Sequence, residues 1–82
     1  MSIVRTSKAV NAIFEERERA RQDDFDMTNT KNDWVAYVNA YTGRAADKVR
    51  RNKREDQNFR ANMIKAGGLI IAALEAQEKG WC

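Results

Sequence analysis

Apolar residues near the start of the chain recur at the spacing of an α-helix. Two arginines continue the same stripe with their long aliphatic stems, so that it consists of Val10, Ile13, Phe14, Arg17 and Arg21. Ser7 and Thr6 precede the stripe, and either one can cap the helix by accepting a hydrogen bond from a free amide of the first turn. The pattern predicts a helix from about Lys8 to Gln22. The segment DDFDMTNTKN that follows is rich in residues that favour caps and turns, and it predicts a break.

A second apolar stripe has the same period and consists of Trp34, Val38, Tyr41, Ala45 and Val49. Thr30 and Asp33 precede it and resemble a capping box, with aspartate in place of the usual glutamate or glutamine. The helix that begins there is expected to reach about Lys53. Gly43 lies inside this helix, where glycine costs about 1 kcal/mol relative to alanine, so we expect a neighbouring helix to pass close to it.

The third stripe belongs to a helix with two apolar faces. The first face is predicted to be a core stripe of Phe59, Met63, Ala66, Ile70 and Leu74. KREDQN predicts a short break before this helix, with Asp56 or Asn58 as its N-cap, and Gly80 predicts its C-terminal end. One small partner helix cannot cover both faces, so a second copy of the chain is expected at an oligomer interface of Ile64, Gly67, Ile70 and Ile71.

The three stripes predict an all-α fold, a three-helix antiparallel bundle completed by homo-oligomerisation. The 82 residues make a single helical domain, 1–82, and a chain of this size buries only about 60% of its unfolded surface. With no histidine and one cysteine, neither a zinc site nor an internal disulfide is expected to stabilise it. The terminal Cys82 is interpreted as a mobile free thiol in a reducing cytoplasm. No apolar run suits a membrane span or a secretory signal, so no membrane partner is expected.

Positive charge is concentrated in one segment. The net charge is +3, and residues 44–60 hold seven cations against three anions, which gives +4. Arginine forks suit bidentate recognition of phosphate or carboxylate. These cations indicate an anionic nucleotide ligand or an acidic protein partner, and the alternative is a solvated helix face in which Asp47 and Glu55 neutralise Arg51. The candidate surface, called the basic ridge, consists of Arg44, Lys48, Arg50, Arg51 and Arg54.

Two further groups have both a functional and a structural interpretation. Trp34, Tyr37 and Tyr41, called the aromatic edge, are spaced like a stacking platform for bases, but also like an ordinary core, which is favoured. Glu15 and Glu18 are three residues apart and could share a magnesium ion, although a solvated acidic face has the same pattern and is favoured. Without a histidine base or a glycine-rich phosphate loop, nucleophilic catalysis is not expected.

Three segments, DWVAYVNAYTGRAADKVRRN, NFRANMIKAG and ALEA, form a pattern within residues 30–78 that resembles a group of short phage- and prophage-encoded helical proteins. More distantly, the chain is similar to the N-terminal region of phage dATP/dGTP diphosphohydrolase-like proteins and to the MazG-like all-α nucleotide pyrophosphatases. The MazG-like class holds magnesium with an E-x-x-E pair and an E-x-x-D pair on two helices. Glu15 and Glu18 match the first pair, whereas Arg44 and Thr30 stand three residues before aspartates, where the second pair requires an acid.

The sequence, with this resemblance, predicts a non-enzymatic phage accessory protein in the cytoplasm of the infected host cell. The protein is expected to bind a host or defence-system component through the basic ridge, as a host-modulating or anti-defence factor, without a cofactor. One alternative is a magnesium-dependent nucleotide pyrophosphohydrolase-like protein. The other is a small nucleotide- or nucleic-acid-binding module, which the modest net charge weakens.

Overall fold

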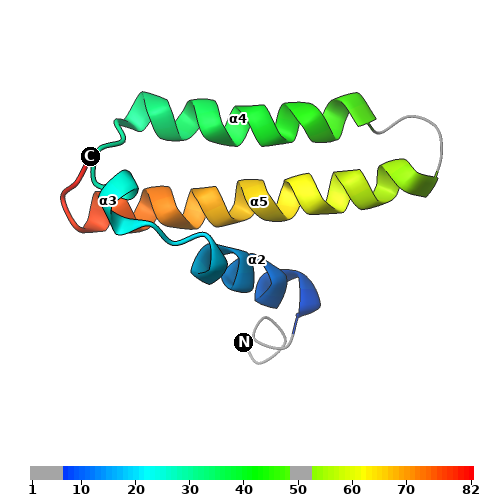
Figure 1. Ribbon diagram of the computed structural model, residues 1–82, viewed down its shortest axis with the longest axis horizontal. Coiled ribbons are helices and arrows are strands. Elements are labelled where there is room, and N and C mark those ends of the chain that lie inside the picture. Colours follow the sequence, from blue (N-terminus) through cyan, green and yellow to red (C-terminus); the bar gives the residue numbers. More distant parts are fainter. Residues whose placement is uncertain (1–6, 49–52) are drawn as a thin grey trace.

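The computed structural model describes residues 7–48 and 53–82, without the side chains of residues 46–58. Within these residues the chain is all-helical and forms four helices (Figure 1). They are α2 (Lys8–Arg19), α3 (Asp23–Asp26), α4 (Lys31–Lys48) and α5 (Lys53–Glu78). The predicted all-α class is confirmed.

The three long helices lie side by side with α5 in the middle. α4 runs antiparallel to α5 along one side, and α2 crosses the other side (Figure 1). Within the described residues the backbones of α2 and α4 do not approach each other. The molecule is therefore close to a single layer of helices, with dimensions of 42 × 32 × 19 Å. A helix is about 10–12 Å across with its side chains, so the shortest dimension is less than two helix diameters.

Local sequence signals set the ends of the helices as predicted in three places. The Ser7 Oγ accepts a hydrogen bond from the amide of Val10 at 3.4 Å, which caps α2. Thr30 and Asp33 form the capping box: each side chain accepts from the other residue's amide, at 3.1 and 2.9 Å. Gly80 has a φ of +80° and ends α5 in the left-handed conformation that glycine tolerates.

The chain folds back beyond Gly80. The Trp81 amide donates to the Ala76 carbonyl at 2.8 Å, and the Gly80 amide donates to the Gln77 carbonyl at 3.0 Å, which is the hydrogen-bond pattern of a Schellman motif. Trp81 and Cys82 then pack against the core beside Trp34. Cys82 is a free thiol, as interpreted from the sequence, and its side chain is half-buried.

Two predicted boundaries are wrong. α2 ends at Arg19 rather than Gln22, and the predicted break after it contains the short helix α3. α5 begins at Lys53, so Asp56 and Asn58 lie within a helix instead of capping it. KREDQ consists mostly of good helix formers and has no glycine or proline to stop the helix. α4 ends at Lys48; the predicted continuation to Lys53 falls on residues 49–52, outside the described ones.

Small residues decide how the helices pack. Trp34 of α4 is buried against Ala72 and Ala76 of α5, whose short side chains leave room for the indole ring. On the other side of α5, a Cβ added to Gly67 would meet the Ile13 side chain at 2.9 Å, so the glycine allows α2 to pass close. The same role expected of Gly43 is wrong, since a Cβ there would meet nothing within 4 Å.

The largest departure from the sequence interpretation concerns the predicted core stripe of α5. Of its five members only Ala66 is buried, while Phe59, Met63, Ile70 and Leu74 are 43–54% exposed. The reason is that α4 packs on the alanine side of α5 and α2 on the glycine side. The four large residues lie between these two contacts, on a broad face of the layer that none of the described helices covers. These four residues are called the α5 apolar stripe below.

Candidate functional site

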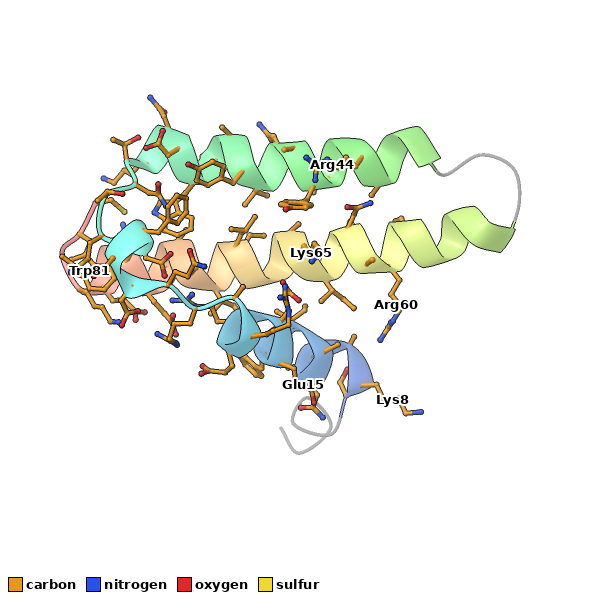
Figure 2. The ribbon with its side chains drawn as sticks, in the orientation of Figure 1. Lys8, Glu15, Arg44, Arg60, Lys65 and Trp81 are labelled. Atoms are coloured by element: carbon orange, nitrogen blue, oxygen red, sulfur yellow. The ribbon has the colours of Figure 1, made fainter. Side chains whose placement is uncertain are left out.

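The described part of the basic ridge is Arg44, on the exposed surface of α4. Its guanidinium carbon lies 4.6 Å from the centre of the Tyr41 ring, within the range of a cation–π interaction. Figure 2 shows Arg44 on the α4 side of the molecule, away from α2. No described carboxylate pairs with it. The side chains of the other ridge members, Lys48, Arg50, Arg51 and Arg54, lie outside the described residues.

The aromatic edge divides into core and surface. Trp34 is only 3% exposed, so it is a core residue and cannot offer a face to a base, which corrects its candidate role in stacking. Tyr37 is half-buried and meets the Trp34 ring edge to face at 6.2 Å. Its hydroxyl donates to the Asn29 side-chain carbonyl at 3.4 Å. Tyr41 therefore remains the aromatic side chain that supports a cation at the surface.

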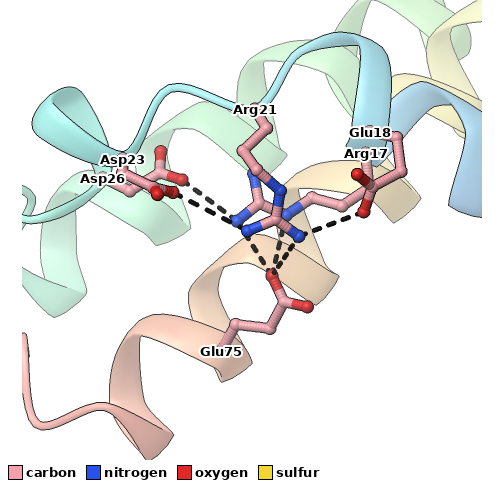
Figure 3. Close-up of polar contacts among 6 residues, drawn as sticks. All are labelled: Arg17, Glu18, Arg21, Asp23, Asp26 and Glu75. Carbon is pink, nitrogen blue, oxygen red and sulfur yellow. Dashed lines mark hydrogen bonds and ion pairs between the residues drawn. The ribbon is translucent and has the colours of Figure 1, made fainter.

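A buried charge cluster that the sequence analysis missed joins three helices. The Arg17 side chain is 5% exposed, and its guanidinium contacts Asp26 of α3 at 3.1 Å and Glu75 of α5 at 2.8 Å (Figure 3). Its Nε also donates to Glu75 at 2.9 Å. Arg21 lies beside it, 3.1 Å from Glu18 and 3.6 Å from Glu75. The cluster ties the loop after α2 to the end of α5 and explains why α3 folds back.

A cleft of about 320 Å³ lies between α2 and α4, with α5 as its floor. The Glu16 carboxylate on its wall accepts from Arg19 at 2.6 Å and faces Lys65 at 3.7 Å. The hydrogen bond from Arg19 lowers the pKa of Glu16 below its ordinary value, partial burial opposes this shift, and the Lys65 charge adds to it. The cations that point into the cleft are thus already paired within the chain, unlike Arg44.

The candidate magnesium ligands do not form a metal site among the described residues. Glu18 is an exposed partner of Arg21, and Glu15 lies on the outer surface of α2 (Figure 2). No group of three acidic, cysteine or histidine side chains comes together in the part of the chain that the structure describes. A pair of exposed carboxylates without further ligands is the pattern of a solvated helix face.

The four residues of the predicted oligomer interface have different surroundings. Ile64 and Ile71 are half-buried, and Ile70 is 46% exposed. The space beside the Gly67 backbone is occupied by the Ile13 side chain of the same chain. A shallow apolar groove of about 300 Å³ runs between α2 and α5 beside them. Its walls are Val10, Ile13, Phe14, Gly67, Ile70 and Ile71.

Comparison with known proteins identifies no relative: no protein-family model, no curated protein and no solved structure matches this chain. None of the described helices is long and apolar enough to cross a membrane.

Proposed function

We propose that the protein acts by binding a macromolecular partner, and that the basic ridge on α4 is the contact surface. The observation that supports this most is that Arg44 has no carboxylate partner among the described residues and rests on an aromatic ring. Arg60 of α5 is also exposed without a described carboxylate partner, but no aromatic ring supports it among the described residues. Arg17, Arg19 and Arg21 are each paired with carboxylates of the same chain. Arg44 is exposed and held only by the Tyr41 ring among the described side chains, so its five donors are available to a ligand.

The partner that suits this surface is an acidic protein. An arginine fork that is held over an aromatic ring loses little conformational freedom when it binds a carboxylate, and arginine and tyrosine are enriched in protein interfaces. The resemblance to short phage-encoded helical proteins adds the biological setting: a host or defence-system component, met in the cytoplasm of the infected cell, would be the target. We also propose that the protein works as a homo-oligomeric bundle.

The test is affinity capture from host lysate with four matched proteins. The wild type is compared with Arg44→Glu and with Lys31→Glu, which changes an exposed cation at the other end of the same helix by the same charge. The proposal expects a partner that the wild type and Lys31→Glu retain and that Arg44→Glu loses. Arg51→Glu should lose it as well, since Arg51 belongs to the same ridge. Equal retention by all four proteins would show that the ridge is only a solvated surface.

A further inference from the structure

The α5 apolar stripe is an unusual surface for a chain of this size. Four large apolar side chains, each roughly half exposed, follow one another along a single helix face. Phe14 of α2 is 54% exposed and lines the groove beside Ile70, so it extends the same face. Contiguous apolar patches of this kind on a small protein mark an interaction site.

The spacing of the stripe is symmetric along the helix. Its members are Phe59, Met63, Ile70 and Leu74, separated by four, seven and four residues, and the pattern is the same read from either end. The midpoint falls between Ala66 and Gly67, the small residues of the series. A helix face with this symmetry is complementary to a copy of itself that runs in the opposite direction, as an isologous two-fold contact requires.

We propose that two copies of the chain pair through the α5 apolar stripe, with their α5 helices antiparallel about a two-fold axis near Ala66 and Gly67. Phe59 of one copy then faces Leu74 of the other, and Met63 faces Ile70. Met63 of the second copy lies over the groove beside Ile70, and an unbranched thioether side chain suits such a shallow, irregular gap.

The area available agrees with what a stable dimer needs. A specific interface removes about 800 Å² from each partner, which is roughly 13% of the 6117 Å² surface of this chain. Taking about 200 Å² for a fully exposed large side chain, the stripe and Phe14 offer about 480 Å² of apolar surface. That is somewhat more than half of the required area, which matches the apolar share of protein interfaces.

Charge does not oppose this arrangement. Between Phe59 and Leu74 the sequence has two charged residues, Arg60 and Lys65. Lys65 lies on the cleft side of α5 with Glu16, away from the stripe. In the antiparallel register Arg60 faces the neighbourhood of Ala73 of the second copy, so no like charges meet between Phe59 and Leu74. The pairing leaves Arg44 free, because Arg44 lies on α4 beside Tyr41.

This dimer rests on the homo-oligomer of the proposed function and gives it a specific interface. It differs from the interface expected from sequence, since of those four residues only Ile70 belongs to the stripe. The partner-binding role of the basic ridge does not depend on it. The following experiments therefore separate failure of the dimer from failure of the proposed function.

The first experiment measures mass by light scattering at micromolar concentration. We expect twice the 9.4 kDa of the chain for the wild type. Met63→Glu or Leu74→Glu should weaken dimerisation at least about a hundredfold, because each would bury an unpaired carboxylate twice. The control is Val35→Glu, an equally exposed apolar residue on α4, 57% exposed, which should leave the mass unchanged. Helix content from circular dichroism shows whether each variant is folded. A wild-type protein that is folded but monomeric overturns both the dimer and the proposed homo-oligomer.

The second experiment tests the register with cysteines in a Cys82→Ser background. Phe59→Cys combined with Leu74→Cys should give a covalent dimer on mild oxidation, since the two positions face each other between copies. Within one chain they lie about 22 Å apart along α5, too far for a disulfide. Phe59→Cys alone should stay monomeric on a denaturing gel. Two results would overturn the antiparallel stripe interface in a protein that is a dimer by light scattering: cross-linking through Phe59→Cys alone, or no cross-linking in the double variant with Leu74→Cys. Either result would leave the homo-oligomer intact.

Discussion

Replacement of Arg17 by methionine should destabilise the protein strongly. Methionine retains an unbranched chain of similar reach but removes the charge, so Asp26 keeps a carboxylate with a side chain only 6% exposed and no cation beside it. Breaking a buried ion pair by removing one partner costs about 3–5 kcal/mol. Domains are stable by roughly 0.05–0.15 kcal/mol per residue, or about 4–12 kcal/mol for this chain. The substitution therefore removes a large part of the total free energy of unfolding.

Urea unfolding followed by circular dichroism measures this free energy. The double variant Arg17→Met with Asp26→Leu should recover most of the loss, because it removes both buried charges and Glu75, 33% exposed, can be hydrated. Arg19→Met is the matched control: that arginine is 64% exposed, and its loss should hardly move the unfolding midpoint. A loss below about 1 kcal/mol for Arg17→Met, the scale of a surface pair, would refute the buried cluster.

Two further predictions follow from the packing and the cleft. Gly43→Ala should raise the free energy of unfolding by about 1 kcal/mol, because alanine favours the helix over glycine and its methyl group meets no other atom there. Gly67→Ala should lower the free energy of unfolding by about 1–3 kcal/mol, because its methyl group would press against Ile13. Equal changes for the two variants in urea unfolding would contradict the close α2–α5 contact. Glu16 has a lowered pKa in the folded protein, so its contribution is present above the ordinary carboxyl pKa of about 4.5 and is lost as the pH falls through the folded value. Thermal unfolding between pH 3 and 6 should accordingly show less acid sensitivity in Arg19→Gln than in the wild type, and identical pH profiles would disprove this.

The sequence predicted local features well because each depends on a few neighbouring residues. The capping box of Thr30 and Asp33 is an example: the partners lie three residues apart, and both hydrogen bonds form as expected. The C-terminal turn at Gly80 is another, since a left-handed residue is needed there. The order of the three long helices required nothing beyond the period of the apolar residues, whereas the short helix α3 was not predicted.

Which face of α5 is buried could not be derived in this way. The large residues of α5 favoured the stripe through Phe59 and Leu74 as the core, but α4 packs on alanines and α2 on glycines, because small residues allow the closest approach. The choice between these faces is made by the partner helices, which the periodicity of one helix does not describe. The sequence places Arg17 in the apolar stripe of its helix. This position was the available signal for the buried cluster, because an arginine that is buried needs carboxylate partners.

The candidate site was predictable in part. Composition placed the positive charge in residues 44–60, and the structure adds that Arg44 is supported by Tyr41 and free of described carboxylates. The difference between Trp34, a core residue, and Tyr41, a half-buried residue that contacts Arg44, depends on how α4 is rotated against α5. Both aromatic residues have the same helical spacing, so the pattern alone does not distinguish them.

The central claim, that the basic ridge binds an acidic partner, is tested most directly by titrating the captured partner calorimetrically at two salt concentrations. Arg44→Glu should bind about 1.5–3 kcal/mol more weakly than the wild type, the scale of a charge-assisted hydrogen bond, and its affinity should depend less on salt. Lys31→Glu should match the wild type in both respects. An Arg44→Glu protein that binds the partner as tightly as the wild type, with the same salt dependence, would contradict the account.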